Sequence, residues 1–112
     1  MRAVFHHSND DPELHGRVLA NTANLLDDES VEIEGVVVVT NSGGLHLVTA
    51  DSEYAERIGT LRDRGVAFRQ CGNTMDGTDI DEDDLVDGVE VVPSGVGELA
   101  RLQEAGYAYL KP

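Results

Sequence analysis

The chain of 112 residues has the size of one domain, and its 40% of hydrophobic residues can supply a buried core. Its 22 acidic and 8 basic side chains give a net charge of −14, which excludes nucleic acid and anionic membrane surfaces as partners. No apolar run approaches the roughly 20 residues of a membrane span, and no apolar leader follows the N-terminus, so we expect a cytoplasmic protein.

The first part of the chain alternates strand-like and helix-like segments. Residues 2–6 form a short apolar run that predicts a buried strand. Asp11 and Pro12 predict the start of a helix that ends near Leu26, because Asp is a favoured N-cap and Pro fits the first helical turn. Residues 31–40 predict a second strand, and its continuously apolar end is typical of a strand buried on both faces.

The middle of the chain repeats this alternation. A polar and glycine-rich turn at residues 41–44 ends the second strand. Asp51 or Ser52 then caps a second predicted helix, and Gly65 ends it. Residues 66–70 predict the third strand.

The last part begins with six acidic residues at positions 79–87, which predict one or two turns of exposed helix. This segment lacks the alternating oxygens and the glycine of a calcium-binding loop, so we interpret it as a solvated surface. Residues 89–92 predict a strand, residues 96–104 a helix and residues 107–110 a fifth strand.

Strands regularly separated by helices indicate right-handed crossovers between parallel strands. We expect a single α/β domain over residues 1–112, with three α/β/α layers and a mostly parallel five-stranded sheet. The strand order stays open, because alternation fits several doubly wound topologies equally well.

Polar and glycine residues follow the first four predicted strands. Because the carboxyl ends of parallel strands meet at one edge of a sheet, we expect these residues to lie together and to support a bound ligand. Asn, Ser and Gly are also ordinary turn residues, which is the alternative explanation. The candidates are His6, Asn9, Asn41, Ser42, Gly43, Gly72, Asn73, Thr74, Ser94 and Gly95.

Cys71 is the only cysteine, which excludes an internal disulfide and a CxxC zinc site. A lone cysteine is often a small buried hydrophobic residue. Here it follows a strand and precedes donors from Asn73 and Thr74 that could stabilise a thiolate. The many carboxylates raise the pKa of a thiol, so reactivity needs local help from a histidine, from Arg69 or from a helix N-terminus. A reactive role also needs a sulfur that visiting molecules can reach.

Other chemistry has weaker support. A cysteine–histidine hydrolase needs an orienting third residue that the sequence does not indicate, and the glycine pair at residues 43–44 matches no nucleotide-binding motif. The spacing of the four histidines matches no familiar set of metal ligands, so we expect no metal and no cofactor. These histidines are His6, His7, His15 and His46.

Several short motifs occur in a fixed order along nearly the whole chain. They are Val4-Phe5-His6, Asn9-Asp10-Asp11-Pro12, residues 21–26, residues 51–58, residues 64–66, Cys71-Gly72-Asn73-Thr74-Met75, residues 88–96 and Gly106-Tyr107-Ala108-Tyr109. In this arrangement the sequence resembles the DsrE/DsrF-like family, the small intracellular proteins of sulfur oxidation and sulfur relay, in its single-domain form.

The resemblance implies a parallel α/β/α fold, assembly into homo-trimers or hexamers, and a cysteine that carries sulfur as a persulfide. Only Cys71 can fill that role here. The chain has no second cysteine to resolve the persulfide, so the resemblance implies a sulfur donor and an acceptor that are other proteins or small thiols. This chemistry needs no cofactor.

Two other functions stay open. The chain could be a noncatalytic α/β module that binds a small ligand or a partner at its polar edge, with Cys71 packed as a structural residue. It could also serve chiefly as a structural subunit of an oligomer.

The charge composition also predicts a halophilic protein, because seven of the eight basic residues are arginine and the acidic surface repels itself in dilute buffer. Molar salt shortens the Debye length to about 3 Å and screens this repulsion. We expect the melting temperature to rise between dilute buffer and molar KCl. A melting temperature that stays constant or falls over this range contradicts the halophilic interpretation.

Overall fold

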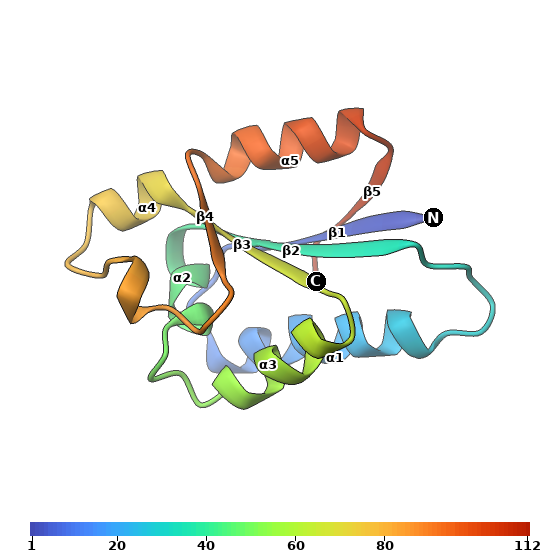
Figure 1. The fold of residues 1–112 in the computed structure, drawn as a ribbon, viewed down its shortest axis with the longest axis horizontal. Coiled ribbons are helices and arrows are strands. Elements are labelled where there is room, and N and C mark those ends of the chain that lie inside the picture. The colour runs from blue at the N-terminus through green and yellow to red at the C-terminus, as the bar shows by residue number, and fades with distance from the viewer.

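Five parallel strands form one sheet in the order β4-β3-β2-β1-β5 (Figure 1). The computed structural model describes all residues 1–112. The sheet confirms the predicted parallel α/β fold and fixes the strand order that the sequence left open. The strands are β1 (Arg2–His7), β2 (Gly35–Thr40), β3 (Ala67–Cys71), β4 (Glu90–Val92) and β5 (Tyr107–Leu110).

Helices cover both faces of the sheet, which confirms the three predicted layers. Helices α1 (Pro12–Asp27), α2 (Leu45–Val48) and α3 (Ala55–Asp63) lie on one face, and α5 (Gly95–Glu104) crosses the other face alone (Figure 1). The short helix α4 (Gly72–Asp76) follows β3 directly at the end of the sheet. None of these helices is long and apolar enough to cross a membrane.

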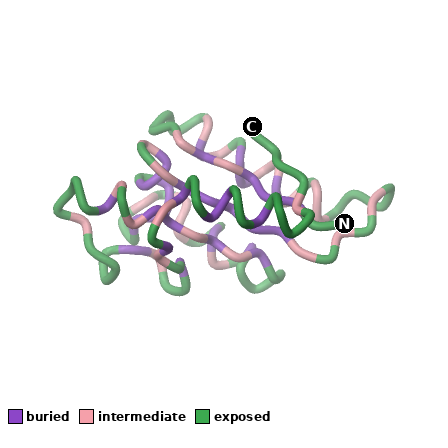
Figure 2. Tube along the Cα trace, turned by 90° about the horizontal axis from the view of Figure 1, so that it is seen from above, coloured by how far each residue is buried: buried purple, intermediate pink, exposed green.

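The two faces of the sheet are packed unequally. A cluster of 15 buried residues fills the face under α1, α2 and α3, whereas 5 buried residues fill the face under α5. Buried positions follow the strands, and the outer side of α5 is exposed (Figure 2). Most of the hydrophobic stabilisation therefore comes from the first face, which leaves room for polar side chains beneath α5.

The start of α1 confirms the predicted cap. The Asp11 carboxylate accepts a hydrogen bond from the Glu13 backbone N–H at 2.9 Å, and Pro12 is the first helical residue. Gly65, at the end of α3, has a φ of +96°, a conformation that glycine adopts without strain. The local sequence signals were therefore sufficient to predict where α1 begins and where α3 ends.

The second strand begins later than predicted, at Gly35 rather than at residue 31. Strand β1 begins at Arg2, which pairs with Gly35, so residues 31–34 have no neighbouring strand to pair with. The Met1 carbonyl instead accepts the Glu34 backbone N–H. The apolar alternation there reflects Ile33, which packs against the larger core from a loop.

One prediction about helices was wrong, one was confirmed, and two short helices were not predicted. Helix α3 begins at Ala55 with Tyr54 as its N-cap, so neither Asp51 nor Ser52 caps it, and the Ser52 hydroxyl accepts the Tyr54 N–H in the preceding turn. The acidic segment at residues 79–87 holds one exposed turn of 3₁₀ helix, η2 (Glu82–Asp84), which confirms the prediction of one or two helical turns. The segments after β2 and β3 contain the helices α2 and α4, which are too short to produce a periodic pattern.

Gly44, in the turn after β2, lies directly against the first strand. A Cβ atom at this position would overlap the backbone carbonyl of His7. Gly59, in the middle of α3, has open space around it. A side chain is therefore excluded at position 44 and accommodated at position 59.

We expect Gly44→Ala to lower the free energy of unfolding by about 3 kcal/mol, because neither backbone segment can move without breaking the pairing of β1 with β2. Gly59→Ala is the matched control and should raise this free energy by about 0.5 to 1 kcal/mol through its helix propensity. Urea unfolding of the two variants measures both effects. Equal changes in the two variants would contradict this account of Gly44.

Candidate functional site

Cys71 is the last residue of β3 and the N-cap of α4. It lies at the carboxyl edge of the sheet, where the C-terminal ends of all five strands meet. Its side chain faces the same side of the sheet as α5, since Arg69 and Cys71 alternate with the buried Phe68 and Gln70. Cys71 is only 6% exposed, so the sulfur that a reactive role must present to other molecules is largely covered.

The connections that follow the strands lead to different faces of the sheet on the two sides of Cys71. The connections after β1 and β2 lead to helices on one face, whereas the connection after β4 leads to α5 on the other face. Strand β3 adjoins β4, so this change of face occurs beside Cys71. In open α/β sheets, ligands bind where neighbouring connections diverge in this way.

Hydrogen-bond donors surround the Cys71 sulfur. Burial raises the pKa of the thiol, but hydrogen bonds from the Gly95 backbone, from the hydroxyl and backbone N–H of Thr74, and from the Asn73 backbone leave this pKa below its ordinary value. Asn73 contributes its backbone rather than its side chain. No histidine or arginine is among the groups that act on this thiol.

Gly95 lets α5 approach the sulfur closely. A Cβ atom at this position would lie 3.1 Å from Cβ and 3.5 Å from Sγ of Cys71, and 3.2 Å from Cβ of Asn41. A larger residue would push the helix N-terminus away from the thiol. The absence of a side chain thus brings Cys71, Gly95 and Asn41 together.

A buried carboxylate holds α5 over β3. Glu98 accepts a hydrogen bond from Arg69 at 2.5 Å and also pairs with Arg101. Burial raises the pKa of Glu98, but the two guanidinium groups outweigh it and lower this pKa below its ordinary value. Arg69 precedes Cys71 by two residues, and Glu98 follows Gly95 by three. The pair therefore fixes the helix N-terminus relative to the thiol.

His6 connects three distant segments at the same edge. Its Nε2 lies 2.9 Å from Oδ1 of Asn41, and its Nδ1 lies 2.5 Å from the hydroxyl of Tyr109. Burial lowers the pKa of His6, and its hydrogen bond with Asn41 opposes this effect. Sequence reasoning missed Tyr109, because nothing in the local pattern indicated that β5 lies beside β1.

Ser42 ties the loop after β2 to the loop after β3. Its backbone N–H donates to the Thr74 hydroxyl at 2.9 Å, and that hydroxyl lowers the pKa of the Cys71 thiol. Ser42 has a φ of +49°, which is uncommon for a residue other than glycine. Strained backbone of this kind often occurs at functional sites.

The structure brings some of the predicted site residues around Cys71 and gives the others local roles. The Asn9 side chain accepts the Asp11 backbone N–H before α1, and the Ser94 hydroxyl caps α5. Gly43 lies against Asp10, and Gly72 lies against the Val92 carbonyl. The group near the thiol consists of Asn41, Ser42, Asn73, Thr74 and Gly95, and His6 joins it through Asn41.

A second histidine cluster lies on the α1 face of the sheet. His7 and His15 are both buried, and Nε2 of His7 lies 2.6 Å from Nδ1 of His15. Burial and the neighbouring His15 lower the pKa of His7 to about 4, so one of the pair stays neutral at physiological pH. No group of three or more histidine, cysteine or carboxylate side chains is arranged to hold a metal ion.

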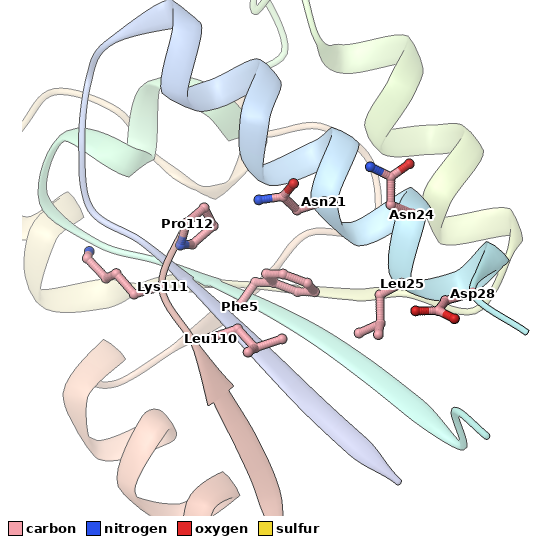
Figure 3. Close-up of a pocket in the computed structure, with 8 residues that line it drawn as sticks. All are labelled: Phe5, Asn21, Asn24, Leu25, Asp28, Leu110, Lys111 and Pro112. Carbon is pink, nitrogen blue, oxygen red and sulfur yellow. The ribbon is translucent and has the colours of Figure 1, made fainter. Parts of the chain in front are cut away.

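The surface pockets do not include Cys71. One pocket of about 380 Å³ lies between α1 and the end of β5, with Asn21 and Asn24 on one side and Leu110 on the other (Figure 3). Strands β1 and β2 separate β5 from β3 in the sheet, so this pocket is distinct from the thiol site.

The arrangement is that of a parallel α/β protein with one thiol held among hydrogen-bond donors at the carboxyl edge. Residues 3–112 match the DsrE/DsrF-like family, and the chain belongs to this family. This confirms the resemblance seen in the sequence.

Two solved structures have the same fold. The protein of unknown function MTH1491 from Methanobacterium thermoautotrophicum is 39% identical, with a TM-score of 0.92, over 99% of this chain and 98% of that one. The ychN protein from E. coli is 20% identical, with a TM-score of 0.80, over the whole of both chains. No curated protein matches the sequence.

We expect Thr74→Val to slow the alkylation of Cys71 by iodoacetamide roughly five- to tenfold at neutral pH, because the lost hydroxyl donor raises the thiol pKa. Thr74→Ser keeps the hydroxyl and is the matched control, so its pH–rate profile should stay close to that of the wild type. A Thr74→Val profile that matches the wild type would show that this hydroxyl does not stabilise the thiolate.

Proposed function

We propose that the protein is a sulfur carrier that holds sulfur as a persulfide on Cys71 and passes it to an acceptor thiol. The observation that carries this proposal is the Cys71 thiol itself, which packs against Gly95 at the start of α5 and whose pKa is lowered by groups of Gly95, Thr74 and Asn73. No carboxylate is among the groups that act on this pKa. Groups that lower the pKa favour the anionic form of sulfur, which is the form that attacks in thiol exchange. Family membership supports the same chemistry.

Loading and unloading are two exchange steps. The Cys71 thiolate attacks the outer sulfur of a donor persulfide, a new sulfur–sulfur bond forms to Sγ, and the donor leaves as a thiolate with the electron pair of the broken bond. An acceptor thiolate then attacks the same outer sulfur, and Cys71 leaves as a thiolate. The sulfur atom moves without net oxidation or reduction, so no redox cofactor takes part.

The donors around Sγ favour the second step as well. Cys71 must leave as a thiolate, and a thiol with a lowered pKa is a better leaving group. The same hydrogen bonds that activate Cys71 for loading therefore assist its release. Because the chain has no other cysteine, the acceptor sulfur must come from another molecule.

Burial of Cys71 limits which molecules can reach it. A persulfide places the reacting sulfur about 2 Å beyond Sγ, so the loaded protein presents that atom farther from the backbone than the free thiol does. Unloading thus needs less opening of the site than loading. Loading is therefore the step that burial of Cys71 hinders more.

The buried thiol also favours a second candidate function. A cysteine that is 6% exposed and hydrogen-bonded can be a packed structural residue in a noncatalytic module that binds a small ligand or a partner. In that case native Cys71 resists alkylation, and Cys71→Ala keeps cellular function. Rapid alkylation of the native protein counts against this function.

We expect purified wild-type protein treated with polysulfide to gain the mass of one or more sulfur atoms, which a reductant then removes. Cys71→Ser should gain none, because its hydroxyl cannot form the sulfur–sulfur bond. Intact-protein mass spectrometry measures both. Equal gains in the two proteins, or no gain in either, would exclude a persulfide on Cys71.

A further inference from the structure

The hydrogen bonds of His6 fix its protonation. Oδ1 of Asn41 can only accept a hydrogen bond, so His6 Nε2 must carry the hydrogen that joins them. In the neutral ring Nδ1 is then bare, and it accepts the hydroxyl hydrogen of Tyr109. The three side chains therefore form one directed chain from Tyr109 to His6 to Asn41.

The Asn41 oxygen faces His6, which leaves the two amide hydrogens on Nδ2 directed elsewhere. Nδ2 forms no hydrogen bond with another protein atom and is open to solvent. Such an amide donor can exchange a water molecule for a bound group.

Asn41 stands beside the thiol without bonding to it. The vacant Cβ position of Gly95 lies 3.2 Å from Cβ of Asn41 and 3.1 Å from Cβ of Cys71, so the two side chains flank the same glycine. Ser42, the next residue, donates its backbone N–H to the hydroxyl of Thr74, one of the residues that act on the thiol. Asn41 is absent from the groups that act on the thiol itself.

We propose that Asn41 binds the terminal sulfur of a Cys71 persulfide through its amide N–H groups, and that His6 and Tyr109 are positioning residues that hold this amide in place. The inference rests on the proposed function and deepens it. The donors of Asn73, Thr74 and Gly95 hold Sγ, and Asn41 holds the atom attached to it. The site thus has separate donors for each of the two sulfur atoms.

The test compares the alkylation rate of the Cys71 persulfide with that of the free thiol as a function of pH, using iodoacetamide. In Asn41→Ala we expect the persulfide to react roughly fivefold more slowly at mildly acidic pH, because its terminal sulfur loses a donor that favours the anion. The free-thiol profile should stay unchanged. Tyr109→Phe should slow the alkylation of the persulfide about twofold, and the matched control Tyr107→Phe should leave this rate unchanged.

A second measurement does not depend on sulfur. The nitrogen chemical shifts of the His6 ring should show a protonated Nε2 and a bare Nδ1 in the wild type at neutral pH. In Tyr109→Phe the Nδ1 shift should move, because its donor is lost, and in Tyr107→Phe it should not. A proton on Nδ1 of the wild type would overturn the proposal.

The remaining outcomes separate two failures. If the wild type loads sulfur but Asn41→Ala keeps the wild-type persulfide profile, or shifts thiol and persulfide equally, the role of Asn41 is overturned and the carrier function stands. Identical persulfide profiles in Tyr109→Phe and Tyr107→Phe overturn the positioning role of Tyr109. If the wild type takes up no sulfur, the carrier function fails, and this inference fails with it.

Discussion

The contact between the N-terminus of α5 and the end of β3 is the constraint on which the site depends. Gly95 can pack against the Cys71 sulfur only because α5 returns across the sheet and is held there by Glu98 and Arg69. The apolar core on this face is small. The buried ion pair therefore contributes a larger fraction of the contacts that hold the helix than it would on the other face. Without Arg69, Glu98 would keep only Arg101 on its own helix, so no ion pair would join α5 to β3.

The site combines a buried sulfur with polar surroundings, and the two properties act in opposite directions on the thiol. Burial alone makes a cysteine inert, whereas donors aimed at its sulfur make the thiolate accessible near neutral pH. In this protein the donors outweigh burial, which is an unusual arrangement for a residue that serves only to fill space. The same closure limits the access of other thiols and of water to Sγ.

Local sequence signals predicted the layers and most of the elements, because caps such as Asp11 and the apolar run of β2 act over a few residues. They could not predict the order of the strands, since no local pattern records which strand lies beside which. Tyr109 meets His6 only because β5 pairs with β1 after the return of α5, so that contact was not predictable. The polar loops correctly marked the carboxyl edge, but ordinary turn and cap roles account for Asn9 and Ser94.

The parallel pairing of β1 with β5 sends the two chain ends to opposite sides of the molecule. Met1 is bonded to Glu34 at the far edge, whereas Lys111 reaches Ser8 beside the loop that follows β1. A tag or fusion partner attached after Pro112 would therefore emerge beside the pocket of Figure 3, which β1 and β2 separate from the strand of the thiol, and would cover that pocket. Attachment at Met1 leaves the pocket open, which makes the amino end the better anchor for immobilised or fused forms of this protein.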